Sequence, residues 1–242
     1  MINTKFFLTN SLLAALTICA CLFGTAAQAQ ITFTAEAITG KVVDEDTGEP
    51  LAGVIIVARW SIDPHFVGYD NELLNVLETV SDKGGSYGFP AWGPKLLSIP
   101  AVFITASELF SNGDDPMVVY YKSGYWPAQE HNDVTYPEEN IANRKTPLGG
   151  FAANGKTIRL KKWDGKDERK YYDNVYDMAH GLKGGWRKYP RMALAIDRIY
   201  QHLLGRIERK EIPSSFIAPH VEGFWMEELS QEDRAYLRRY AE

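Results

Sequence analysis

Histidine is the first residue type to test for chemistry, because imidazole is both a zinc ligand and a general base. The five histidines stand at positions 65, 131, 180, 202 and 220. Zinc peptidases space their ligands as His-Glu-x-x-His, or as His-x-x-Glu with a distant third His, so that the ligands converge on the metal. The five positions match neither spacing. We therefore expect no zinc site, no catalytic residue and no cofactor.

Ser86 lies in a segment that satisfies the Gly-x-Ser-x-Gly pattern of serine hydrolases, Gly84-Gly-Ser-Tyr-Gly88. In those enzymes the serine sits on a sharp turn between a strand and a helix. Here turn residues precede Ser86, and a short β-type segment closed by Pro90 follows it. We interpret the match as accidental and expect a protein that is not an enzyme.

An acidic turn is the second candidate site. It contains Asp44, Glu45, Asp46 and Glu49, whose oxygens could hold calcium. The turn lacks the regular spacing of carboxylates found in calcium-binding loops, and a solvated turn accounts for the same residues. The calcium interpretation stays open, although we expect no metal here.

Aromatic residues are numerous, with six Trp and thirteen Tyr. In a sandwich most of them belong to the core, but exposed rings can stack on sugars or on a protein partner. The loop from Tyr125 to Asn140 is long for a hairpin, and function tends to collect on such loops. Its Trp126, His131 and Tyr136 are the predicted ligand-binding residues.

A basic segment lies between two predicted helices. It reads Lys183-Gly-Gly-Trp-Arg-Lys-Tyr-Pro-Arg191, with four cations, no acid and two aromatics. Such a segment could bind an anionic headgroup or the acidic part of its own chain. A solvated loop between helices is the simpler interpretation.

The first 29 residues have the order of a secretory signal. Lys5 precedes an apolar core from Leu12 to Phe23, which is too short to span a bilayer as a helix. Ala27-Gln-Ala29 then supplies the small residues that a signal peptidase recognises. We expect cleavage after Ala29 and an exported protein, periplasmic or secreted, with no transmembrane segment left in the mature chain.

A second processing route stays open. Ile18-Cys-Ala-Cys21 loosely resembles the lipobox of bacterial lipoproteins, in which Cys21 would carry the lipid. Both cysteines precede Ala29, so cleavage there leaves a mature chain without disulfides. The fold must then hold by burial alone.

Charge divides the mature chain into two parts. The 242 residues carry a formal charge of -5, which argues against nucleic acid as a partner because phosphate binding needs a basic face. Residues 30–165 hold 11 basic and 18 acidic residues, whereas residues 166–242 hold 14 and 13. The acidic part and the nearly neutral part are predicted to be two structural regions.

Hydrophobic periodicity changes at the same boundary. Short β-type segments separated by turns predict strands at 35–43, 53–60, 73–80, 87–89, 97–104, 117–122 and 157–163. The first two are expected to form a hairpin or an adjacent pair across the acidic turn. After residue 165, apolar residues recur at helical spacing, and they predict helices near 172–182, from Pro190 to Ile207, and from Gln231 to Ala241.

Two ordered motifs occur in the β region. The first is Ile38-Thr-Gly-Lys-Val-Val-Asp-Glu-Asp-Thr-Gly-Glu-Pro-Leu-Ala-Gly-Val-Ile-Ile-Val57, and the second is Thr79-Val-Ser-Asp-Lys-Gly-Gly-Ser-Tyr-Gly-Phe89. They resemble the G-x-V-x-D-x-x-T-G-x-P-L-x-G-V-x-V and T-D-x-x-G-x-Y-x-F segments of carboxypeptidase regulatory-like domains. Val80 and Ser81 stand where that family has a simpler Thr-Asp step. The resemblance covers residues 36–163.

The resemblance implies a seven-stranded transthyretin-like (prealbumin-like) β-sandwich at 30–165. The helical periodicity predicts an α-helical C-terminal tail at 166–242. It also implies a non-catalytic accessory module of the cell envelope, which presents loops to a protein or glycan partner. One alternative is a small-ligand carrier or an enzyme with a site between sandwich and tail. Another is a lipid-anchored accessory protein of the outer membrane.

Overall fold

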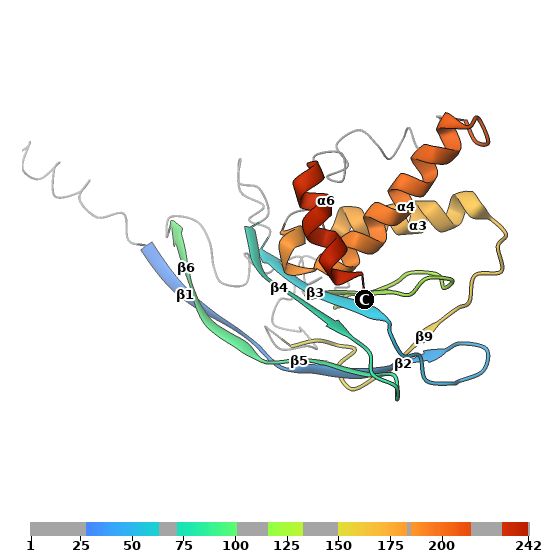
Figure 1. Cartoon of the computed structure of the whole chain (residues 1–242). Helices are drawn as coiled ribbons and strands as arrows, with labels where there is room; N and C mark the ends of the chain where they lie inside the picture. Colours follow the sequence, from blue (N-terminus) through green and yellow to red (C-terminus); the bar gives the residue numbers. More distant parts are fainter. Residues whose placement is uncertain are drawn as a thin grey trace, which may run out of the picture.

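The computed structural model describes residues 28–62, 72–100, 116–132, 150–182, 185–213 and 229–241. Strands come first and helices follow (Figure 1). The strands are β1 (Gln28–Ala35), β2 (Ile38–Asp44), β3 (Ile55–Ile62), β4 (Glu72–Val80), β5 (Ser86–Phe89), β6 (Trp92–Pro100), β7 (Met117–Tyr121), β8 (Ala128–Glu130) and β9 (Thr157–Leu160). The helices are α3 (Glu168–Gly181), η2 (Trp186–Lys188), α4 (Pro190–Glu208), α6 (Gln231–Leu237) and η4 (Arg238–Tyr240).

The strands form two sheets and a ribbon. One sheet has the order β5-β2-β9, with β2 and β9 parallel, and the other has the order β4-β3-β7-β8, with all pairs antiparallel. β1 and β6 pair as a two-stranded ribbon that extends beyond the sheets (Figure 1). The two sheets face each other across the first core. This core includes Val42, Ile56, Trp60, Tyr87, Val118, Tyr120, Ile158 and Leu160.

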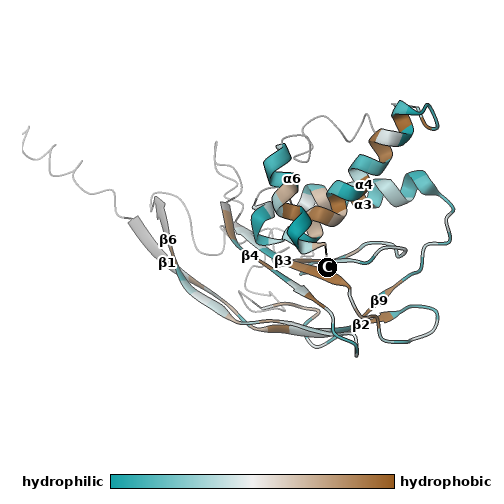
Figure 2. Ribbon diagram, viewed as in Figure 1, coloured by the Kyte–Doolittle hydropathy of each residue, from teal (hydrophilic) through white to brown (hydrophobic). Residues whose placement is uncertain are grey.

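The helical tail covers the outer face of the β4-β3-β7-β8 sheet and creates a second core. Val57 and Val119 from the sheet are buried there with Met178 from α3 and Met192 from α4. Figure 2 shows these helices, which carry both hydrophilic and hydrophobic residues, lying over the hydrophobic strand β3. All five residues of β7 are buried, because the strand contributes side chains to both cores. The molecule therefore has three layers: sheet, sheet and helices.

Polar side chains fix the starts of two helices. Glu78 of β4 caps α4 from the neighbouring sheet, because its carboxylate accepts the backbone N–H groups of Arg191 and Met192 at 3.2 and 2.8 Å. In α6, Ser230 and Asp233 form a capping box in which each side chain accepts the other residue's backbone N–H. The first contact ties the helical layer directly to the sandwich.

The turn before β5 requires glycine. Asp82 accepts the N–H groups of Gly84 and Ser86 through one carboxylate oxygen, at 2.8 and 2.9 Å. Gly85 follows with φ of 75°, and a Cβ there would lie 2.3 Å from the carbonyl oxygen of Val42. The turn predicted at Ser81–Gly85 is thus held by an aspartate and by close packing on β2.

The expected order of a β-sandwich and a helical tail is confirmed, but one predicted pairing is wrong. The segments at 35–43 and 53–60 do not form a hairpin, because β2 and β3 belong to opposite sheets. The acidic turn instead carries the chain from one sheet to the other, and Val43 and Pro50 form an isolated bridge at its base. The described residues contain nine strands rather than seven, with β1 and β8 as additions. In the same residues, no helix is long and apolar enough to cross a membrane.

Candidate functional site

The predicted ligand-binding residues have separate positions in the structure. Trp126 follows the turn after β7 and is half-buried, with its ring 5.6 Å from that of Tyr171 in an edge-to-face arrangement. Lys170 lies over the same tryptophan, 6.0 Å from the ring centre. His131 is exposed just after β8 and takes no part in these contacts. Tyr136 lies outside the described residues.

Trp126 belongs to a cluster that we call the aromatic corner: Trp126, Trp163, Tyr171 and Tyr172. Trp163 stacks on Tyr171, with 4.1 Å between ring centres and 10° between ring planes. Tyr172 completes the group with edge-to-face contacts to Trp163 and Tyr171. Tyr171 is buried, whereas the two tryptophans are half-buried. The corner therefore presents two tryptophan rings on a fixed tyrosine support.

Backbone hydrogen bonds position the two tryptophans. The N–H of Trp126 donates to the carbonyl of Lys161 at 2.9 Å, and the N–H of Trp163 donates to the carbonyl of Gly124 at 2.9 Å. The indole N–H of Trp163 also donates to the carbonyl of Lys166 at 2.6 Å. The turn after β7 is thus tied to the segment that leaves β9. This link places the tryptophans on one corner although they are far apart in the sequence.

The support of the corner is electrically neutral. Burial raises the pKa of the Tyr171 hydroxyl, and the neighbouring Tyr121 hydroxyl raises it further. Burial also raises the pKa of Tyr121. Both phenols therefore stay protonated at neutral pH. Exposed charges of both signs lie near the tryptophans: Lys166 forms an ion pair with Asp164 at 3.5 Å beside Trp163, and Lys170 lies over the ring of Trp126.

The acidic turn is built around Asp44. One carboxylate oxygen of Asp44 accepts the N–H groups of Asp46 and Thr47 at 3.0 Å each, and the other accepts the Tyr125 hydroxyl at 2.9 Å. These hydrogen bonds, the one from Thr47 most of all, lower the pKa of Asp44. In the part of the chain that the structure describes, no group of three or more His, Cys, Asp or Glu is placed to hold a metal ion. The carboxylate of Asp44 already has a structural role in shaping the turn.

Ser86, His180 and His202 lie in positions that do not form the sites considered for serine and histidine chemistry. Ser86 opens β5, which leads to β6 rather than to a helix, so the elbow of serine hydrolases is not formed. His180 is exposed and stacks on Tyr176, and His202 is exposed on α4. His65 and His220 lie outside the described residues.

The sequence points to Trp126 as a candidate, but it does not point to Trp163 or Tyr171, which lie in the aromatic corner with Trp126. A signal was present, because Trp163 follows two lysines and precedes the Tyr171-Tyr172 pair by a short interval. The sequence pattern does not show that Tyr171 contacts both tryptophans. Their contact depends on α3 crossing the outer face of the sheet next to the turn after β7.

Comparison with known proteins shows no family. No family model and no curated protein matches the chain. Among solved structures, a 3-chlorocatechol 1,2-dioxygenase from Rhodococcus opacus matches with a TM-score of 0.29 and 17% identity, over 55% of this chain and 62% of that one. A 9R-lipoxygenase from Cyanothece matches with a TM-score of 0.25 and 11% identity, over 70% of this chain and 24% of that one. The chain therefore spans less than two thirds of either protein.

Proposed function

We propose that the protein is a non-catalytic accessory module of the cell envelope that binds a protein or glycan partner through the aromatic corner. The observation that carries the proposal is the pair of half-buried tryptophans, Trp126 and Trp163, held by stacking and hydrogen bonds on the buried Tyr171. Rings fixed in advance lose little conformational freedom when a ligand stacks on them. The exposed lysines next to them add hydrogen-bond donors for sugar hydroxyls or carboxylates.

Export and family belong to the same proposal. Cleavage after Ala29 would start the mature chain inside β1, which pairs with β6. The two facing sheets are compatible with a carboxypeptidase regulatory-like sandwich of transthyretin type across residues 36–163. Mass spectrometry of the mature N-terminus tests the processing: a chain that begins at Gln30 supports cleavage by signal peptidase, and a lipid on Cys21 contradicts it.

The interface between sandwich and tail bears on the alternative of a carrier or an enzyme. In the described residues, side chains from both layers fill this interface, and Val57, Val119, Met178 and Met192 are all fully buried in it. These apolar side chains are used to hold the sheet and the helices together. The aromatic corner, at the rim of the interface, is the better place for a ligand.

Crosslinking and pull-down of the mature protein from its native envelope tests the proposal. The test variant combines Trp126→Leu and Trp163→Leu, which keep apolar side chains but remove both flat rings. The control is Trp92→Leu, because Trp92 is another half-buried tryptophan and lies outside the corner. We expect a recurrent protein or glycan partner that the double variant loses and the control keeps. Equal recovery with all three proteins would refute the role of the corner.

A further inference from the structure

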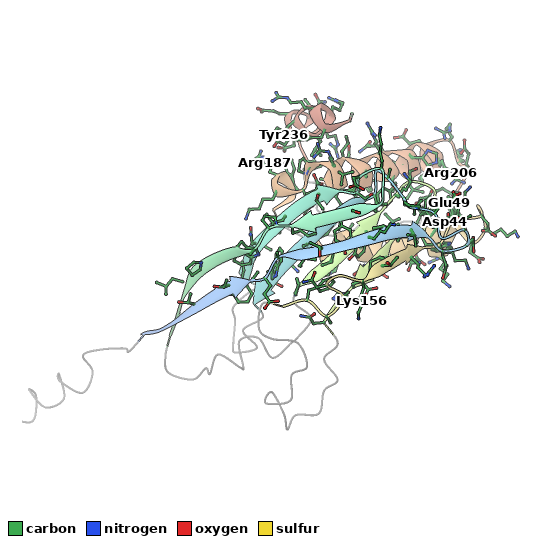
Figure 3. All side chains as sticks on the ribbon, turned by 90° about the horizontal axis from the view of Figure 1, so that it is seen from below. Asp44, Glu49, Lys156, Arg187, Arg206 and Tyr236 are labelled. Atoms are coloured by element: carbon green, nitrogen blue, oxygen red, sulfur yellow. The ribbon has the colours of Figure 1, made fainter. Side chains whose placement is uncertain are left out.

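A second surface, at the start of α4 and the end of the chain, concentrates positive charge. We call it the arginine face: Arg187 and Lys188 of η2, Arg191 of α4, and Arg238 and Arg239 of η4. All five residues are exposed. Residues 186–191 and 236–240 come together there, because α6 packs on α4 and Trp186 contacts Tyr236. Figure 3 shows Arg187 and Tyr236 close together at one end of the helical layer.

Three aromatic rings support the arginines. The Trp186 ring lies 5.9 Å from that of Tyr236, which lies 5.5 Å from that of Tyr240, and the two tyrosine hydroxyls are 3.1 Å apart. Each ring has a guanidinium group above it, from Arg187 at 4.9 Å, from Arg239 at 5.9 Å and from Arg191 at 5.8 Å respectively. Arginines held on aromatic rings lose less conformational freedom when they meet an anion.

The ion pairs of this surface expose the positive partner and hide the negative one. Arg187 binds Asp233 at 2.9 Å, with side-chain exposures of 70% and 19%. Arg191 lies 3.6 Å from Glu78, with side-chain exposures of 44% and 4%. Each carboxylate therefore lies beneath its arginine. A ligand approaching from solvent meets guanidinium groups first.

The remaining cations have no acidic partner in the described part of the chain. There, no carboxylate forms an ion pair with Lys188, Arg238 or Arg239, and Glu232 is the exposed acid of α6. The acidic turn with Asp44 and Glu49 lies toward the other end of the molecule (Figure 3). Among the described residues of this surface, cations thus outnumber carboxylates, in a chain whose formal charge is -5.

We propose that the arginine face docks the protein on an anionic lipid surface. Preformed guanidinium groups bind phosphate in a bidentate manner, and several basic side chains together hold a protein at an anionic leaflet. Half-buried Trp and Tyr side chains favour the headgroup level, where one edge of the ring meets apolar material and the other meets water. Acidic carbohydrate would satisfy the charges, but each of the three rings has a guanidinium group over its face and does not offer that face to a sugar. The inference is independent of the partner proposed for the aromatic corner.

Sedimentation of the full mature chain with lipid vesicles tests the inference. The vesicles contain phosphatidylcholine alone or phosphatidylcholine with phosphatidylglycerol. The test variant combines Lys188→Gln, Arg238→Gln and Arg239→Gln, all of them exposed. Arg238 ends α6 through its backbone N–H group, which the substitution keeps. The control combines Lys41→Gln, Lys156→Gln and Arg159→Gln, which remove the same charge from exposed residues of β2, of the turn before β9 and of β9 itself. Circular dichroism checks that both variants keep the fold.

We expect binding to the vesicles with phosphatidylglycerol and none to phosphatidylcholine alone. The test variant should bind about a hundredfold more weakly, since each of the three basic side chains contributes about fivefold to binding at an anionic surface. The control should bind like the natural sequence, and added salt should weaken binding. Three results would overturn the inference: no binding to anionic vesicles, equal losses in both variants, or binding to a soluble acidic polysaccharide without binding to vesicles.

Discussion

Two neighbouring valines of β7 test whether the helical tail covers the sandwich. Val118 belongs to the core between the sheets, and Val119 belongs to the core between the outer sheet face and the helices. Both are fully buried, and they point to opposite faces because side chains alternate along a strand. We consider Val118→Thr and Val119→Thr separately. Threonine has the shape of valine and a similar preference for strands, so each change adds a hydroxyl without leaving a cavity.

The expected cost is the same on the two faces. Burying a hydroxyl without a full hydrogen-bond partner costs about 1–3 kcal/mol in proteins. A domain of this size unfolds about 2–4 °C lower for each kcal/mol lost. We therefore expect both variants to lose about 1–3 kcal/mol of unfolding free energy. If helices did not cover the outer face, Val119→Thr would instead put a hydroxyl into water at almost no cost.

Urea unfolding followed by tryptophan fluorescence measures both variants against the natural sequence. The slope of unfolding free energy against urea concentration should be the same in the variants and the natural sequence, which would show that the same surface is exposed on unfolding. Val118→Thr is the matched control, because its cost does not depend on the tail. The reasoning fails if Val118→Thr is destabilised by the expected amount and Val119→Thr unfolds like the natural sequence.

Three further changes probe single contacts. Gly85→Ala should cost about 2 kcal/mol or more, measured by thermal unfolding, because φ is 75° and the new Cβ would meet the Val42 carbonyl at 2.3 Å; a neutral result would contradict this turn geometry. Ser230→Ala should cost about 1 kcal/mol by removing half of the capping box, seen as faster hydrogen exchange in α6; unchanged exchange would count against the cap. Burial raises the pKa of Glu78 above its ordinary 4.5, so the folded protein binds this proton more tightly than the unfolded chain. The protonated Glu78 therefore stabilises the fold fully at pH values below 4.5, and this stabilisation is lost as the pH rises through the raised pKa of the folded state. Glu78→Gln should remove that dependence, whereas parallel pH profiles of stability would disprove it.

The sequence predicts elements better than it predicts their partners. Turn residues and apolar segments locate β3, β4, β5, β7 and β9 to within a few residues, because these signals are local. The error over β2 and β3 concerns pairing, which depends on contacts far away in the chain. β8 escaped prediction because Ala128-Gln-Glu130 is short, has no strand pattern and joins the edge of the sheet by pairing with β7. The continuous apolar character of β7 indicates burial on both faces, but it does not show that helices pack on the outer face.

For the candidate surfaces too, the sequence indicates single residues but not which residues meet. Trp126 was predicted because its loop is long and aromatic, whereas Trp163 and Tyr171 required knowledge of where α3 lies. The cations of residues 183–191 were also visible in the sequence. What the sequence could not show is that the C-terminal tyrosines lie under the arginines, or that Glu78 of the sandwich lies behind Arg191.

The position of β2 between β5 and β9 sets an order of assembly. β5 follows β2 closely, but the edge next to β9 joins residues 115 apart, as in the hydrogen bond from Thr39 to Asn154. A chain that is synthesised from its N-terminus contains β2 long before β9 is available. Pairing across such a separation is slow, because a long loop must close before the contacts form. The sheet can therefore be completed only after most of the chain has been made, and one edge of β2 has no partner strand until then.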